Sequence, residues 1–138
     1  MFEIETHRLE KKFGSFTAVN SIDLQVKKGE IFGFLGPNGA GKTTTIKMLT
    51  TLAAPTSGTA IIAGFDVAKE PAKVRSRIGV VPQSFSLFEE LSPMENLWYI
   101  GKLNEIPEKE IGAKSIELLK AVTLYDKTTC HPAGFLAG

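Results

Sequence analysis

The stretch GPNGAGKTT, residues 36–44, decides the fold because it satisfies the pattern G-x-x-x-x-G-K-[ST]. An apolar run, IFGFLG (31–36), comes directly before it, and apolar residues at helical spacing follow it. We therefore expect a strand at 31–36 that is covered on both faces, then a loop, then a helix over about 42–53. The buried face of that helix would carry Ile46, Leu49 and Ala53.

The composition of this loop suits the binding of several phosphate oxygens. Glycines leave the backbone N–H groups of the turn open to an anion, where side chains would block them. The first turn of the following helix adds unpaired N–H donors and about half a positive charge. Lys42 would bring a mobile positive charge to the β- and γ-phosphates, and Thr43 would offer a hydroxyl to Mg²⁺. A glycine-rich turn with an incidental lysine is the plain alternative, and the strand–loop–helix context argues against it.

The flanking sequence predicts two kinds of structure. Alternating apolar residues over about 2–7 and 22–27 predict two neighbouring antiparallel strands. A strand at 59–63, a short helix at 71–77 and a buried strand at 78–81 follow. Later, Ser92 and Glu95 form a capping box with Pro93 at the first helical position, and a second helix starts near Pro107. The buried side of that second helix would carry Ile111, Leu118, Leu119 and Val122.

Charge and cysteine content exclude several classes of protein. With 16 basic and 15 acidic residues the net charge is +1, so charge alone favours neither nucleic acid nor an anionic membrane as a partner. Cys130 is the only cysteine, which excludes an internal disulfide and fits a reducing cytosol. The N-terminus lacks the pattern of a signal peptide, and no apolar run approaches about 20 residues. Any work at a membrane would therefore depend on a partner's membrane span.

Several further segments extend the pattern of the loop over about residues 2–126. Gln83 follows Lys42 by 41 positions in VVPQ, and Phe13 lies in LEKKFGSFTAV upstream of the loop. Together with PTSGTAIIAGFDV and RIGVVPQ, these segments resemble the nucleotide-binding domain of ABC transporters, most closely the drug- and antibiotic-exporter branch. The resemblance implies an α/β P-loop NTPase core with an N-terminal antiparallel β-subdomain and a following helical subdomain, the C-terminal part of the core being missing. The β-subdomain and incomplete core would occupy 1–90, and the partial helical subdomain with an irregular tail 91–138.

The same resemblance implies a role for each matching residue. The ring of Phe13 would stack on adenine, although a lone phenylalanine is more often a core residue. Gln83 would contact Mg²⁺ or the attacking water, so that Lys42 and Gln83 are the implied catalytic residues and Thr43 and Gln83 the implied metal ligands. The implied phosphate-binding residues are Gly36, Pro37, Asn38, Gly39, Ala40, Gly41, Lys42, Thr43 and Thr44.

The implied activity is that of an ATP-binding subunit, or a truncated fragment of one, that binds MgATP and energises export. Its implied partners are a transmembrane permease subunit and, in a functional dimer, a second ATP-binding subunit, with no nucleic acid. Its implied location is cytoplasmic, peripheral at the inner face of the cell membrane, with membrane contact only through the partner. The family's signature motif, Walker B strand and switch histidine have no match here, and His131 lies in the irregular tail. We therefore expect little or no hydrolysis by this chain alone.

Three other functions fit parts of the pattern. A small P-loop metabolite kinase would need a lid with arginines at the phosphates, and the basic residues after the loop are dispersed. A non-catalytic remnant would bind nucleotide or a partner subunit weakly. An ABC protein of translation or DNA repair usually carries tandem cassettes or large insertions, which are not visible here. Product formation in a metabolite screen would separate the kinase from the transporter subunit.

Overall fold

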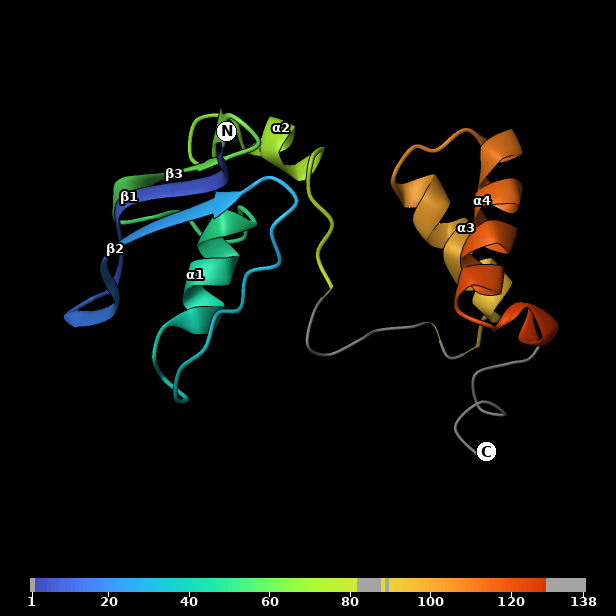
Figure 1. Ribbon diagram of the computed structural model, residues 1–138, viewed down its shortest axis with the longest axis horizontal. Coiled ribbons are helices and arrows are strands. Elements are labelled where there is room, and N and C mark those ends of the chain that lie inside the picture. Colours follow the sequence, from blue (N-terminus) through green and yellow to red (C-terminus); the bar gives the residue numbers. More distant parts are fainter. Residues whose placement is uncertain (1, 82–87, 89, 129–138) are drawn as a thin grey trace. The chain divides into compact units, whose positions relative to one another are not determined.

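The chain divides into two compact units, Met1–Val81 (unit 1) and Pro82–Gly138 (unit 2). The computed structural model describes residues 2–81, 88 and 90–128. Unit 1 contains a β-sheet with a helix against it, and unit 2 contains a pair of helices (Figure 1). In the described ranges, none of the helices has both the length and the apolar character needed to cross a bilayer.

Unit 1 is built on a four-stranded antiparallel sheet in the order β2-β1-β3-β4. Its strands are β1 (Phe2–Phe13), β2 (Phe16–Lys27), β3 (Ser57–Ile62) and β4 (Phe65–Asp66). The two strands predicted from alternation at 2–7 and 22–27 do pair, with Thr6 opposite Leu24, and both extend further than expected. The strand predicted at 59–63 is confirmed as β3, which pairs with the other side of β1.

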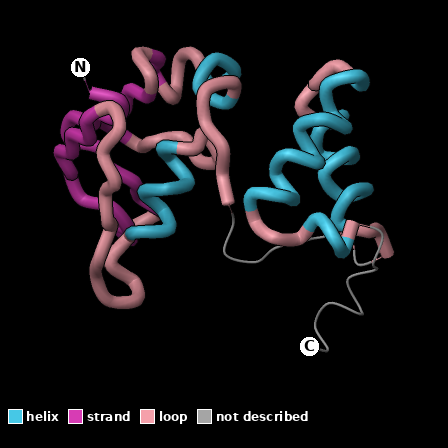
Figure 2. The backbone as a smooth tube through the Cα atoms, turned by 45° about the vertical axis from the view of Figure 1, so that its right-hand side comes forward, coloured by secondary structure: helices cyan, strands magenta, loops and turns pink. Residues whose placement is uncertain are grey.

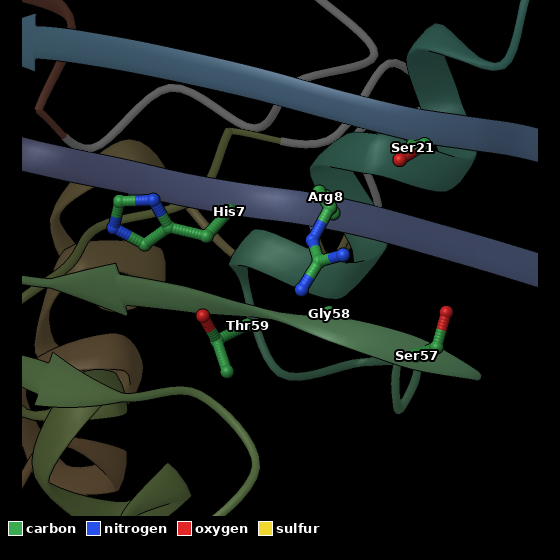
Figure 3. A pocket seen from close by; sticks show the side chains of 6 residues that line it. All are labelled: His7, Arg8, Ser21, Ser57, Gly58 and Thr59. Atoms are coloured by element: carbon green, nitrogen blue, oxygen red, sulfur yellow. The ribbon is translucent and has the colours of Figure 1, made fainter.

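A set of bulges interrupts the sheet near the middle of β1. Arg8 and Ser21 both have positive φ, at 46° and 49°, where the β1–β2 register shifts. The side chain of Asp23 accepts the Arg8 N–H at 2.7 Å, which satisfies a donor of the bulged strand. A shallow hollow of about 410 Å³ lies here, lined by His7, Arg8, Ser21, Ser57, Gly58 and Thr59 (Figure 3). Residues 36–44 do not line this hollow, so it is separate from the glycine loop.

Helix α1 (Lys42–Leu49) lies against the sheet and completes the core of unit 1 (Figure 2). Met48 is fully buried, and burial of such a side chain contributes about 2 kcal/mol of hydrophobic stabilisation. The core consists of Leu9, Val19, Met48, Ala60, Ile62, Val67 and Val74, the last from the short helix α2 (Pro71–Arg75). The helix is shorter than the predicted 42–53, and Ile46 is 48% exposed, so its prediction as a buried residue is wrong. Leu49 and Ala53, the other residues of the predicted face, are partly buried and pack against the core, while the most buried residues of α1 are Thr45 and Met48.

The two strands predicted at 31–36 and 78–81 are not formed. Ile31 and Leu35 are almost fully exposed, and Val81 is 78% exposed. A strand of a parallel core needs hydrogen-bonded neighbours, and among the described residues no segment pairs with either stretch. Both stretches are apolar, but the prediction that they are buried in a sheet is wrong.

Unit 2 is a helical hairpin of α3 (Pro93–Leu103) and α4 (Glu108–Ala121), followed by a short 3₁₀ helix, η1 (Tyr125–Lys127). The predicted capping box is confirmed, since Ser92 Oγ accepts the Glu95 N–H while the Glu95 carboxylate accepts the Ser92 N–H. The helices approach closely at Gly101, where a Cβ would lie 3.0 Å from the Ile111 side chain.

The predicted buried face of α4 is only partly right. Ile111 and Leu119 are buried, but Leu118 and Val122 are more than half exposed. Helical spacing places these four residues on one broad side of the helix. Among the described residues of unit 2, α3 makes the main contact with α4 and η1 a smaller one, and part of that side stays uncovered.

Candidate functional site

The glycine loop leads directly into α1, and its conformation depends on two left-handed residues. Gly39 and Gly41 have φ values of 84° and 83°, a region that costs other residues about 1–2 kcal/mol. Gly41 is the N-cap of α1. Gly41, a fixed position of the pattern, and Gly39, at a position that the pattern leaves open, therefore both meet a backbone requirement of the loop.

Gly41 also makes a close contact that no side chain would permit. A Cβ built at this position would lie 2.4 Å from the carbonyl oxygen of Ala18 and 3.1 Å from a methyl group of Val19. Both neighbours belong to β2, so the start of α1 is packed directly on that strand. Spacing alone did not predict this contact, because it joins residues more than twenty positions apart.

The side chain of Lys42 folds back over the loop. Its ammonium group donates hydrogen bonds to the carbonyl oxygens of Gly36 at 2.5 Å and of Pro37 at 2.7 Å. These are charge-assisted bonds to groups that stay near solvent, so an anion can compete for the ammonium. The arrangement holds a full positive charge at the loop.

The N-terminus of α1 presents backbone N–H donors that no group in the described part of the chain accepts. Thr45 is the first residue of α1 whose backbone N–H makes the helical hydrogen bond, donating to the Gly41 carbonyl oxygen at 2.8 Å. The amides of Lys42, Thr43 and Thr44 precede it and have no acceptor within the helix, and no side chain caps them. With the helix dipole, these three N–H groups favour an anion at this end of α1.

The threonines of the loop differ in their surroundings. Thr45 is buried, and its hydroxyl donates to the Gly41 carbonyl at 3.0 Å, so its role is structural. Thr43 is exposed and its hydroxyl has no protein partner in the described part of the chain. The hydroxyl of Thr43 is therefore available to a ligand, and that of Thr45 is not.

Phe13 lies at the end of the β1–β2 hairpin and belongs to the same unit as the loop. Its ring is 56% exposed, and it pairs in register with Phe16. Ala18 follows Phe16 by two residues on β2, a distance of about 7 Å along the strand, and it contacts Gly41. In Figure 1 the β1–β2 turn and the N-terminal end of α1 lie at the same end of unit 1. Phe13 is therefore an exposed aromatic ring near the loop and not a core residue.

Gln83, the second implied catalytic residue and metal ligand, lies outside the described residues. The other predicted site residues all lie in unit 1. Gly36 to Thr44 form one continuous segment, and Phe13 belongs to the β1–β2 hairpin. The structure adds Lys11, whose ammonium lies over the Phe13 ring. Nothing in the spacing of the sequence singled out Lys11.

Comparison with known proteins decides the family. A family model described as "ABC transporter" matches residues 19–134, which is most of the chain. The chain belongs to the ABC transporter family. The resemblance inferred from residues 36–44 and their flanking segments is thereby confirmed.

Among curated members of the ABC transporter family, this chain is similar to antibiotic-resistance ATP-binding proteins. It is 39% identical over 124 residues to the linearmycin resistance ATP-binding protein LnrL of Bacillus subtilis, covering 90% of this chain and 40% of that protein. It is 44% identical over 123 residues to the daunorubicin/doxorubicin resistance ATP-binding protein DrrA of Streptomyces peucetius, covering 89% and 37%. The chain therefore spans less than half the length of these ABC relatives.

Solved structures of ABC proteins give the same assignment of fold. An ATP-binding cassette of an ABC transporter matches with a TM-score of 0.83 and 28% identity, covering the whole of this chain and 60% of that one. A nucleotide-free cassette matches with a TM-score of 0.79 and 28% identity, covering 95% and 58%. The fold is the α/β P-loop NTPase class that the resemblance implied.

The residues present in this ABC chain fit a nucleotide polyphosphate. Helix α1 contributes N–H donors that no side chain caps, and around Gly39 of the loop no heavy atom lies within 4 Å of the Cβ position. Lys42 supplies the positive charge, and the free hydroxyl of Thr43 is a hard oxygen donor of the kind Mg²⁺ accepts.

Proposed function

We propose that this chain binds MgATP through residues 36–44 as the ATP-binding part of an ABC exporter. The observation that carries the proposal is the ammonium of Lys42, held over the loop by the Gly36 and Pro37 carbonyls beside an uncapped helix N-terminus. A triphosphate brings several negative oxygens, which match a full positive charge and a group of parallel N–H donors. A neutral ligand would gain less from these features than a polyphosphate, and a cation would be repelled by both.

Within this proposal each residue has a separate task. The amides of the loop and of α1 bind phosphate oxygens, and Lys42 lies with the β- and γ-phosphates. Thr43 holds Mg²⁺, which when bound neutralises phosphate charge during phosphoryl transfer. Phe13 stacks on the base, which its 56% exposure supports. Gln83, the second implied metal ligand, would contact Mg²⁺ or the attacking water.

The proposed wider function is export of an antibiotic-like compound through a separate transmembrane permease. The names of the linearmycin and daunorubicin resistance relatives support this compound class. The proposed location is cytoplasmic, at the inner face of the membrane, with a second ATP-binding subunit completing a dimer. In unit 2, helix α3 carries exposed apolar side chains on more than one side, Trp98, Ile100 and Leu103, and this exposure supports a protein partner.

A comparison of ATP with AMP tests the binding mode. We expect AMP to bind about 100-fold more weakly than ATP in the presence of Mg²⁺, because AMP lacks the two phosphates assigned to Lys42 and the loop amides. Isothermal titration of the chain with each nucleotide measures the difference. Equal affinity for ATP and AMP would show that the β- and γ-phosphates are not bound and would reject the proposal.

A further inference from the structure

Lys11 connects the exposed ring of Phe13 to a distant part of unit 1. Its ammonium lies 5.2 Å from the centroid of the Phe13 ring, over one face of it. The same ammonium donates a hydrogen bond to the carbonyl oxygen of Ala54 at 2.6 Å. The lysine is therefore fixed at two points, on the ring and on the segment that leaves α1.

Neighbouring backbone groups hold the hairpin end to the same segment. The Lys12 N–H donates to Thr56 Oγ1 at 3.0 Å, and the Thr56 N–H donates to the Glu10 carbonyl at 2.9 Å. With the Lys11–Ala54 bond and a longer bond of 3.5 Å from Thr56 Oγ1 to the Lys12 carbonyl, four hydrogen bonds join residues 10–12 to 54–56. The backbone that carries Phe13 is thus anchored, and the Lys11 ammonium has a defined position from which to contact the ring.

We propose that Lys11 is a positioning residue for the nucleotide base: it occupies one face of the Phe13 ring and leaves the opposite face for a purine. This inference rests on the proposed function, in which Phe13 stacks on the base. A cation on one face fixes the ring orientation and draws electron density toward itself, which favours an electron-rich base on the other face. The base then has a single docking side.

Substitution of Lys11 by methionine separates this role from phosphate binding. Lys11→Met keeps an unbranched apolar side chain and removes the charge. Because the ring then loses its fixed orientation and its polarisation toward the base, we expect a change in affinity of about 2–5-fold, the size of an exposed cation–π effect. We expect ATP affinity to fall by that factor while the affinity for inorganic tripolyphosphate, which has no base, is unchanged. Lys11→Arg should restore ATP affinity to within about 2-fold, because guanidinium also stacks on aromatic rings.

Two controls complete the titration. Lys12→Met removes the adjacent lysine, whose ammonium pairs with Glu10 instead, and should change neither affinity. In a Phe13→Leu background, Lys11→Met should have no further effect on ATP. The proposal is overturned if Lys11→Met weakens tripolyphosphate and ATP equally, or if it leaves ATP affinity unchanged.

A measurement on the unmodified chain avoids any loss of folding in the variants. The ε-methylene protons of Lys11 should show an upfield ring-current shift in NMR spectra, and that shift should persist when MgATP is added. Loss of the shift on ATP addition would mean that the base displaces the lysine, which contradicts the proposal. If ATP binding does not depend on Lys42, the proposed function itself fails; if it does and Lys11 has no effect, only this inference fails.

Discussion

Replacing Lys42 by alanine is expected to weaken MgATP binding about 100-fold. In the free chain the ammonium is held by two loop carbonyls, and these bonds can be exchanged for phosphate oxygens. Charge-assisted hydrogen bonds contribute about 1.5–3 kcal/mol each, so loss of two of them at the low end of this range, about 3 kcal/mol, gives a factor on the order of 100. Titration calorimetry or a fluorescent ATP analogue measures the dissociation constant.

The matched control for this substitution is Lys47→Ala. Lys47 lies in the last turn of the same helix and is exposed, so its removal changes the net charge equally without touching the loop. We expect Lys47→Ala to leave the dissociation constant within about 2-fold, since separated surface charges are largely screened by salt. If Lys42→Ala and Lys47→Ala bind MgATP equally well, the role given to Lys42 is wrong.

The second large effect is expected from Gly41→Ala. The added Cβ would meet the Ala18 carbonyl at 2.4 Å, and because that oxygen belongs to the backbone of β2, strand or helix must move. Positive φ adds strain for alanine. Together we expect the free energy of unfolding of unit 1 to fall by about 2–4 kcal/mol, a large share of a typical domain's 5–15 kcal/mol.

Gly39→Ala is the control that separates the effect of the Ala18 contact from the effect of the positive φ. Its φ of 84° matches that of Gly41, but no heavy atom lies within 4 Å of the Cβ position. Gly39→Ala should therefore cost only about 1 kcal/mol. Hydrogen exchange of the β1 and β3 amides reports on unit 1 specifically, whereas the single tryptophan, Trp98, lies in unit 2. An equal loss of protection in the two variants would show that the Ala18 contact has no energetic effect.

Local features of the sequence predicted local structure well. The capping box at Ser92 depends on residues three positions apart, and it forms as expected. The loop and the start of α1 were likewise predicted correctly, because glycine, lysine and threonine spacing determines them within nine residues. These cases share short-range hydrogen bonds that need no distant partner.

Features that depend on distant partners were predicted less well. The apolar run at 31–36 suits a covered strand, but Ile31 and Leu35 are exposed because no described segment pairs with it. Leu118 shows the same limit for a helix, since periodicity cannot say how much of an apolar side is covered. The contact of Gly41 with Ala18 was missed because it joins residues far apart in the sequence. The contact of Lys11 with Phe13 was also missed: these residues are two positions apart, but their spacing does not say that the ammonium lies over the ring.

The most direct test of the central claim is a ¹⁵N NMR titration of the chain with MgATP. The claim is that the uncapped amides of Lys42, Thr43 and Thr44, with the Lys42 ammonium, form a polyphosphate site. We expect these three amide resonances to shift most strongly and to saturate at one nucleotide per chain, with AMP producing much smaller changes. Resonances that stay unchanged at high MgATP, with the Lys42 ammonium still bound to the Gly36 and Pro37 carbonyls, would contradict the account.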